Sequence, residues 1–368
     1  MEIKVYASCR LAVGCVLLFA AILLAMGGAL TPSAARAELP ATEDQPNDDH
    51  VESTFIFTEE NDSLANTDKN YTNGIRFQWI SGDISRYAKN NQLPRAMLSV
   101  LKFLPYFNQP GMQHNLGVTV GQIIYTPRDI HTSRYLPDQR PYAGWSFVSL
   151  ALHAKTAYRL DTLEGTLGIV GPSSLAGTFQ NTTHEIMGIK TAEGWEHQLH
   201  DEPTLQLSWN RTLRSYRHDF NNRLAFDILP HFGATGGNAL ILANAGFEMR
   251  FGYNLPWDFG TSLIRPGGGV SAPVAQDDAN QEKSPLWGAH LFVGADGRGV
   301  ARNMFLDGNT WGESHSVTKN ILVGDVMAGV ALSMGSIKLT YTQVLRSQEF
   351  TDQQSAQLFG SLGLSVTF

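Results

Sequence analysis

Short segments in which apolar and polar residues alternate recur along most of the chain. Leu205, Leu207 and Trp209 alternate with polar residues, and the last eleven residues, 358–368, repeat the pattern. A period of two places successive side chains on opposite faces of a strand. Segments of about ten such residues, each weak alone but cumulative, are typical of a transmembrane β-barrel.

Twelve segments of this kind are predicted to be strands. They lie near 54–62, 73–81, 114–122, 145–155, 163–171, 204–213, 224–233, 243–253, 287–296, 321–333, 336–346 and 358–368. An even number is usual for a single-chain barrel of bacterial outer membranes. The predicted fold class is therefore all-β, an antiparallel transmembrane β-barrel of about twelve strands. A soluble periplasmic sandwich, which also alternates, is the competing fold.

The predicted connections differ greatly in length. Residues 172–203 and 297–320 are expected to be long loops, and 334–336 a tight turn. Residues 82–112 contain an apolar stretch that could form a short amphipathic helix at the end of the barrel.

The N-terminus has the organisation of a secretory signal peptide. Lys4 and Arg10 precede an apolar run over 11–30, which is followed by an Ala-Arg-Ala triplet. A small-residue triplet after the apolar run is a cleavage signal, so 1–37 is expected to be removed. The alternative is a retained membrane anchor, because the apolar run is long.

The remaining chain divides into a polar lead-in, 38–53, and the barrel domain, 54–368. Cys9 and Cys15 both lie in the signal peptide, so the exported chain has no disulfide and no thiol chemistry. The formal net charge of −7 argues against a nucleic-acid partner. Export, the absence of cysteine and a last strand ending on Phe368 favour the barrel over the sandwich. We therefore expect the barrel assembly machinery to insert this chain into the outer membrane.

An even number of strands places both termini on the periplasmic side. The connections after the odd-numbered strands then lie outside the cell. The segments 60–72, 125–145 and 171–209 contain three of these connections, and they are the richest in reactive side chains. They are predicted to share one face of the membrane.

The segment ENDSLANTDKNYTNG begins at Glu60 and is rich in short oxygen-bearing side chains. Asn61 and Asp62 can form an Asx turn, and Asn73-Gly74 is a turn signal. The spacing of an EF-hand calcium loop is absent. The residues alone leave open whether this is a turn or a cation site.

His184 is the candidate general base. It stands beside Glu185 in NTTHEIMG, within the predicted loop after the fifth strand. Imidazole is the commonest base near neutral pH, although a loop histidine is more often merely solvated. Neither G-x-S-x-G nor H-E-x-x-H occurs, which argues against a serine elbow and a zincin.

Several short strings, in this order and spacing, together resemble the outer-membrane lipid A 3′-O-deacylases of Gram-negative bacteria. The strings are Asn61-Asp62, Tyr71-Thr72-Asn73-Gly74, Gln122-Ile123-Ile124-Tyr125-Thr126-Pro127, Arg140-Pro141-Tyr142-Ala143-Gly144, Ile169-Val170-Gly171-Pro172, Gln180-Asn181, His184, Gly188 and Trp195. The resemblance covers most of the chain and weakens after about residue 250.

The resemblance implies a twelve-stranded barrel enzyme whose calcium-dependent site lies between loops at the outer rim. Its substrate would be lipid A, the anchor of lipopolysaccharide. His184 would activate water, and Asn61, Asp62 and Thr72 would supply oxygens to the site and to calcium. These are hard oxygen donors, which suit Ca²⁺.

Two positions depart from the family pattern. Family members have a carboxylate six residues after the histidine, where this chain has Lys190. Either Glu193 supplies the missing metal carboxylate, or Lys190 meets a lipid phosphate. Where the family has a phosphate-binding lysine, this chain offers Arg128, whose guanidinium fork also matches phosphate.

Two other functions remain open from the sequence. An outer-membrane phospholipase would share the barrel and calcium but should have a serine two residues after its base, where this chain has Ile186. A non-enzymatic porin or receptor would need only the strands.

Overall fold

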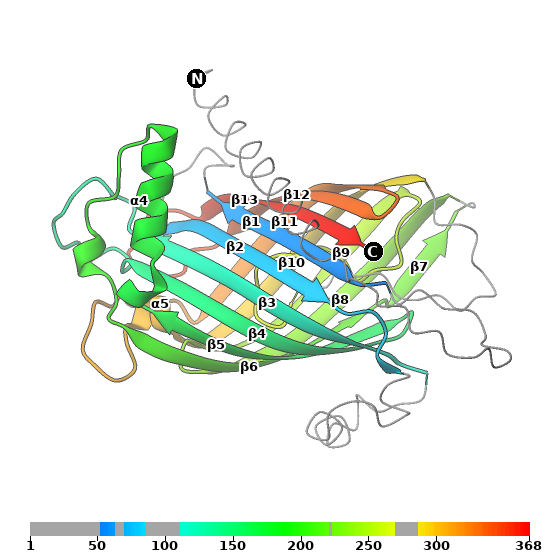
Figure 1. Ribbon diagram of the computed structural model, residues 1–368, viewed down its shortest axis with the longest axis horizontal. Coiled ribbons are helices and arrows are strands. Elements are labelled where there is room, and N and C mark those ends of the chain that lie inside the picture. Colours follow the sequence, from blue (N-terminus) through cyan, green and yellow to red (C-terminus); the bar gives the residue numbers. More distant parts are fainter. Residues whose placement is uncertain (1–51, 63–69, 86–110, 221–222, 269–285) are drawn as a thin grey trace, which may run out of the picture.

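The computed structural model describes residues 52–62, 70–85, 111–220, 223–268 and 286–368. In these ranges no helix is long and apolar enough to cross a membrane. Antiparallel strands form one continuous sheet (Figure 1). The strands are β1 (Thr54–Asn61), β2 (Asn70–Ile80), β3 (Gln113–Thr126), β4 (Ala143–Lys155), β5 (Arg159–Val170), β6 (Glu202–Leu213), β7 (Tyr216–Asp219), β8 (Leu224–Gly237), β9 (Leu240–Tyr253), β10 (Trp287–Asn303), β11 (Leu322–Met334), β12 (Ile337–Arg346) and β13 (Gln357–Thr367).

Twelve of these strands close into a barrel. The first strand pairs with the last, with Thr54 opposite Thr367, and β6 pairs with β8 across the remaining gap. The short strand β7 only extends one edge of β8 beyond the end of β6. The closed antiparallel barrel of twelve strands confirms the predicted fold class, and each predicted strand corresponds to an observed one.

Two of the predicted loops are wrong in part. The ladder of β10 continues through 297–303 and is followed by the short helix α5 (Met304–Asp307). The segment 172–203 contains η2 (Pro172–Ser174), helix α4 (Ala176–Met187) and η3 (Trp195–His197). Most of 82–112, where a helix was predicted, falls outside the described residues.

The outer wall of the barrel is apolar. One row of residues in register runs across five neighbouring strands, with every side chain outward: Leu205, Leu167, Val148, Val120 and Phe77. The first four are well exposed although they are large and apolar. An outward apolar band is what a barrel presents to lipid.

The lumen is occupied by the segment that follows β9, residues 254–268, called here the lumen segment. Backbone N–H groups of Ile264 and Gly267 donate to Glu60 and Glu164, which project inward from β1 and β5, at 2.7 and 3.0 Å. Arg265 forms an ion pair with Asp325 of β11 at 3.2 Å. The lumen segment is therefore bonded to strands around the wall.

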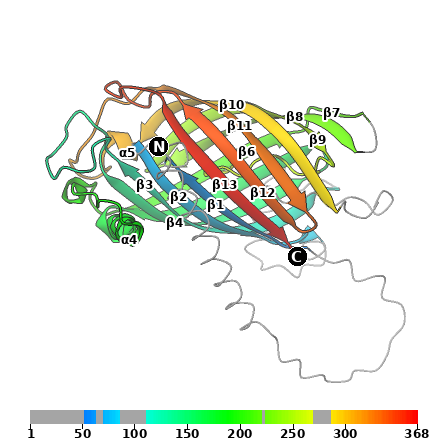
Figure 2. The ribbon, with the colours of Figure 1, turned by 90° about the horizontal axis from the view of Figure 1, so that it is seen from above.

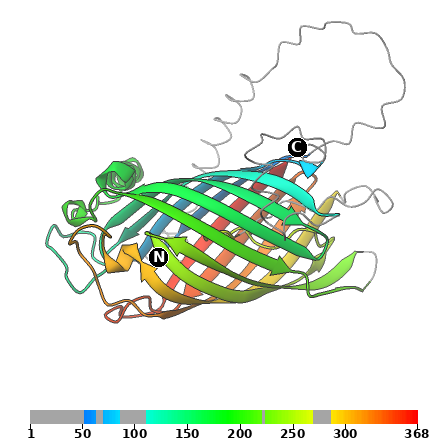
Figure 3. The ribbon, with the colours of Figure 1, turned by 90° about the horizontal axis from the view of Figure 1, so that it is seen from below.

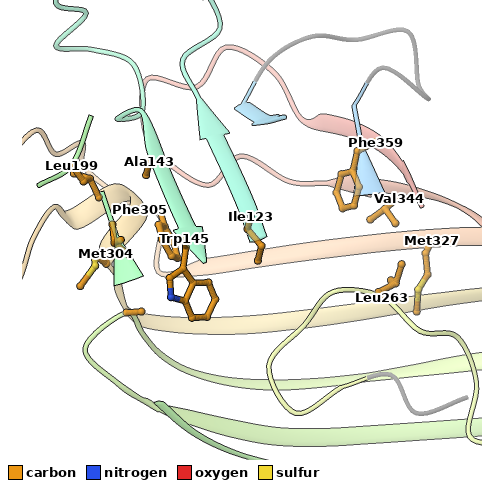
Figure 4. Close-up of a cluster of buried hydrophobic side chains, with 12 residues drawn as sticks. Ile123, Ala143, Trp145, Leu199, Leu263, Met304, Phe305, Met327, Val344 and Phe359 are labelled. Atoms are coloured by element: carbon orange, nitrogen blue, oxygen red, sulfur yellow. The ribbon is translucent and has the colours of Figure 1, made fainter. Parts of the chain in front are cut away.

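A cluster of buried hydrophobic side chains lines the lumen near the α5 end of β10 (Figure 4). Leu263 of the lumen segment belongs to the same buried cluster as Trp145, Phe305 and Phe359, which come from β4, α5 and β13. Burying one such side chain stabilises the fold by roughly 1.5–3 kcal/mol. The cluster therefore helps to fix the inner side of the rim.

Candidate functional site

The candidate site lies at one end of the barrel, called here the α4 end. The strands β1, β3 and β5 all run toward it, and α4 stands there (Figure 1). The prediction that the loops after β1, β3 and β5 share one end of the barrel is therefore confirmed. That this end faces the outside of the cell follows from the same topology and remains a prediction.

Asn61, Asp62 and Thr72, called here the first-strand group, are brought together by the pairing of β1 with β2. Asn61, the last residue of β1, pairs with Asn73 of β2, so Asp62, directly after β1, and Thr72 of β2 come next toward the rim. Asn61 and Asp62 are buried, and the β2–β3 register shifts between Tyr71 and Asn73, at Thr72. An irregularity of this kind redirects the chain locally.

The turn signal at Asn73-Gly74 does not produce a turn, and the predicted strand beginning at residue 73 is confirmed. Both residues lie inside β2, where Gly74 pairs with Glu60 on one side and Ile123 on the other. Two neighbouring ladders outweigh the local turn preference of an Asn-Gly pair.

Helix α4 is fastened to the outside of the barrel wall. The carbonyl of Ser174 accepts hydrogen bonds from Gln122 of β3 and Ser146 of β4, at 2.7 and 2.8 Å. The first residue of the helix, Ala176, sits over Gly144, where a Cβ would overlap with the Cβ of Ala176 and the Oγ of Ser174. Glycine is required at Gly144 for this close approach.

His184 lies on the third turn of α4 and not in a loop. Its Nδ1 is 2.9 Å from the backbone carbonyl of Lys190. Because a carbonyl only accepts, Nδ1 carries the proton and Nε2 holds the lone pair. The sequence did not predict this helix because few of its residues face a core: only Ala176 and Gln180 are buried.

Two neighbouring side chains of α4 hold the segment that returns after the helix. Asn181 bonds the backbone of Ala192 twice, donating to its carbonyl at 3.1 Å and accepting from its N–H at 2.9 Å. Gln180 accepts from the indole N–H of Trp195 at 2.8 Å. The sequence identified this pair only as a motif, without a role. The pair fixes the course of the chain past Lys190, and hence the carbonyl that orients His184.

The remaining predicted residues lie on the surface of the same end. Lys190 and Glu193 form an exposed ion pair with 3.0 Å between Nζ and Oε1. Exposed pairs of this kind contribute little, about 0–1 kcal/mol, so either partner can be recruited elsewhere. The guanidinium of Arg128 bonds Gln354, which follows β12.

The first-strand group has the donor chemistry that calcium requires. Asn61 and Asp62 carry amide and carboxylate oxygens, which are hard ligands, whereas the side chain of the predicted ligand Thr72 lies outside the described part of the structure. Among the described residues, no group of three or more His, Cys, Asp or Glu side chains gathers as a metal site. The group thus offers one carboxylate, that of Asp62.

A closed barrel with an apolar outer wall, a segment bonded inside its lumen and a histidine-bearing helix on the outside of one rim defines an outer-membrane protein with a candidate site at that rim. The family model "Outer membrane protein LpxR" matches residues 17–368. The chain therefore belongs to the LpxR family of outer membrane β-barrel proteins, a family associated with lipid A modification.

Two solved structures are similar to this chain, and the first of them supports the fold. LpxR from Salmonella typhimurium is 16% identical with a TM-score of 0.67, over 86% of this chain and all of that one. The β domain of the Bordetella autotransporter Brka is 10% identical with a TM-score of 0.40, over 86% of this chain and 98% of that one. No curated protein sequence matches.

Proposed function

We propose that this protein is a lipid A 3′-O-deacylase, an esterase that removes the 3′-linked acyl group from lipid A at the outer rim of its barrel. The observation that carries the proposal is the orientation of His184. Its Nδ1 is held by the Lys190 carbonyl, which leaves Nε2 as a base on the outside of the barrel wall. Membership of the LpxR family supplies the substrate class.

The strands and the helix support a shared site. Asn61, Asn73, Ile124 and Gly144 lie in one register row, so Asn61 is about 14 Å from the seat of α4 at the usual strand spacing. Eight residues of helix separate Ala176 from His184, a rise of about 12 Å. These lengths are similar, so α4 is long enough to carry His184 toward the first-strand group.

In the proposed reaction, Nε2 of His184 takes a proton from water, and the oxygen of that water attacks the acyl carbonyl carbon. The ester C–O bond breaks, and the sugar oxygen receives the proton from the imidazolium. The products are a free carboxylic acid and a free hydroxyl group. The Lys190 carbonyl stabilises the imidazolium through Nδ1–H, as the orienting group of a histidine base does.

Asn61, Asp62 and Thr72 are the proposed calcium ligands, with Glu193 as the second carboxylate. Calcium bound there would act as a Lewis acid toward the developing oxyanion. Arg128 and Lys190 are proposed to meet the phosphate groups of lipid A.

The contents of the lumen count against a diffusion pore. The lumen segment bonds to inward glutamates on β1 and β5, and Leu263 packs in the cluster at the α4 end. A protein whose only task was to let solutes through would not need this obstruction. A phospholipase remains the second candidate, because the same base and calcium would hydrolyse a phospholipid ester.

Mass spectrometry of lipid A separates these functions. Cells that express the protein should lose the 3′-linked acyl group, and cells that express His184→Ala at equal outer-membrane level should retain it, with activity reduced about a hundredfold or more. Altered phospholipids with intact lipid A would indicate the phospholipase. Near-normal deacylation by a well-inserted His184→Ala protein would overturn the role of His184.

Calcium is tested separately. Activity of the purified protein should disappear with a calcium chelator and return on adding Ca²⁺, because the proposed ligands are oxygens only. Full activity after exhaustive chelation would remove calcium from the proposal.

A further inference from the structure

The outward face of α4 carries a narrow stripe of large apolar side chains. The helix lies beside the barrel wall and not over its lumen (Figures 2 and 3). Leu175, which caps its start, and Phe179, Thr182 and Ile186 follow one another at intervals of four, three and four residues, which places them on one face. We call these four residues the outer stripe.

The outer stripe is turned away from the protein. Leu175 is 65% exposed, Phe179 41% and Ile186 82%. His184 is two residues from Ile186, a rotation of about 200°, so it faces the opposite side of the helix. The base and the apolar stripe therefore occupy opposite faces of one helix.

The outer stripe continues the lipid-facing wall. Val120 and Val148 are exposed members of the apolar row on β3 and β4. The next outward position along these strands is Gln122 and Ser146, which bond the Ser174 carbonyl just before α4. Helix α4 therefore begins at the edge of the apolar wall that is nearest the α4 end. On β3 and β4 the only outward polar residues between the wall and the helix are Gln122 and Ser146, which fasten it.

We infer that the outer stripe of α4 is immersed in the acyl-chain region of the outer leaflet. The helix then lies between the membrane and the site, because its outer face contacts lipid chains and its inner face carries His184. Exposed apolar side chains that continue an established lipid-facing surface are expected to be covered by the same lipid. On the proposed function, a lipid substrate would reach His184 sideways without leaving the membrane.

Site-directed fluorescence tests the immersion without reference to catalysis. Ile186→Cys and, as matched control, the neighbouring Glu185→Cys are made in a chain whose Cys9 and Cys15 are replaced by Ser, and each is labelled with the environment-sensitive fluorophore NBD. The folded proteins are reconstituted into phospholipid vesicles that contain rough lipopolysaccharide. Quenching is measured with aqueous iodide and with phosphatidylcholine carrying a doxyl group on its acyl chain.

The label at position 186 should emit at shorter wavelength, resist iodide severalfold better than the label at 185, and be quenched by the acyl-chain doxyl group. Equal iodide quenching at both positions, with no doxyl quenching at 186, would overturn the inference. Protection at 186 that depends on protein density and is not accompanied by doxyl quenching would show a second copy as the occupant, and would also overturn it.

A second measurement connects immersion to turnover and rests on the proposed function. The double variant Phe179→Ser, Ile186→Ser should raise the apparent KM for lipid A in vesicles about tenfold, because it removes apolar area from the membrane-facing surface. Its turnover of detergent-dispersed lipid A should equal that of the native protein. An equal loss of activity on vesicle-bound and detergent-dispersed lipid A would overturn sideways entry. If the native protein turns over neither, the proposed function alone is contradicted, and the fluorescence result still decides whether the stripe is immersed.

Discussion

At the scale of single residues, the orientation of His184 depends on a side chain that touches neither substrate nor reacting atoms. Asn181 bonds both backbone groups of Ala192, and this holds the returning chain whose Lys190 carbonyl contacts Nδ1 of His184. Loss of Asn181 should free that carbonyl to move. The imidazole would then sample the tautomer with its proton on Nε2, which cannot act as the base.

The expected result for Asn181→Ala is a fall in kcat of about ten- to a hundredfold, with KM changed little, because misplacing a catalytic group affects the chemical step. Thr178→Ala is the matched control, since Thr178 is an exposed residue of the same helix. Steady-state kinetics on detergent-dispersed lipid A measure both variants. An unchanged kcat for Asn181→Ala would show that the carbonyl of Lys190 is held by other means.

The ion pair between Lys190 and Glu193 gives two opposite expectations for calcium. If Glu193 supplies the second carboxylate, Lys190 competes with the metal for it. Then Lys190→Met should tighten calcium binding severalfold and Glu193→Gln should weaken it, as charge count sets the affinity of such sites. Terbium luminescence in the folded protein reports both shifts. An unshifted midpoint for Glu193→Gln would remove Glu193 from the calcium site.

At the scale of elements, the position of the candidate site depends on how closely α4 can approach β4. Gly144 has no side chain, and the first residue of the helix occupies the space that a Cβ would need. Even the methyl group of alanine would have to displace the helix start, together with the Ser174 carbonyl that Gln122 and Ser146 bind. The barrel ladder itself would be unaffected, since its hydrogen bonds are made by the backbone.

Gly144→Ala should therefore leave an inserted, heat-resistant barrel but reduce deacylation about a hundredfold, the effect of a shift of about 1 Å at a catalytic group. Gly165→Ala is the control, because a Cβ at Gly165 on β5 meets no atom within 4 Å. Heat-modifiable migration on gels verifies folding, and lipid A mass spectrometry measures activity. Normal activity of Gly144→Ala would mean that the helix position is not set at this contact.

The strands could be predicted from the sequence, whereas the helix could not. A strand of the wall shows its fold in its own residues, since one face meets lipid and the other the lumen, as in Leu205, Leu207 and Trp209. Only Ala176 and Gln180 of helix α4 are buried, and its exposed apolar residues face outward, so its pattern has no core-facing stripe. The role of Lys190 was unpredictable for a simpler reason: the group that orients His184 is a backbone carbonyl, which has no sequence signal.

At the scale of the whole molecule, buried charges link the lumen segment to the barrel wall. Asp258 bonds Arg250 of β9 and Lys338 of β12, two strands that are not neighbours. Burial alone would raise the pKa of Asp258, but Lys338 and Arg250 outweigh it and hold that pKa below its usual range. The charged form of Asp258 is therefore the one that links the lumen segment to the wall.

A carboxylate with a lowered folded-state pKa contributes stability that is fully present above its unfolded pKa, about 3.9, and is lost as pH falls toward the folded value. The native barrel should thus become more heat-sensitive below about pH 4. Asp258→Asn should lower stability at pH 7, roughly by 3 kcal/mol for a broken buried pair, and should flatten the acid dependence. Adding Lys338→Met to Asp258→Asn removes the ammonium left without its partner and should recover part of the loss. The temperature at which the folded gel band disappears, measured at pH 7 and pH 3, compares the three proteins. The same acid sensitivity in native protein and Asp258→Asn would show that other carboxylates, and not Asp258, govern the acid stability of the barrel.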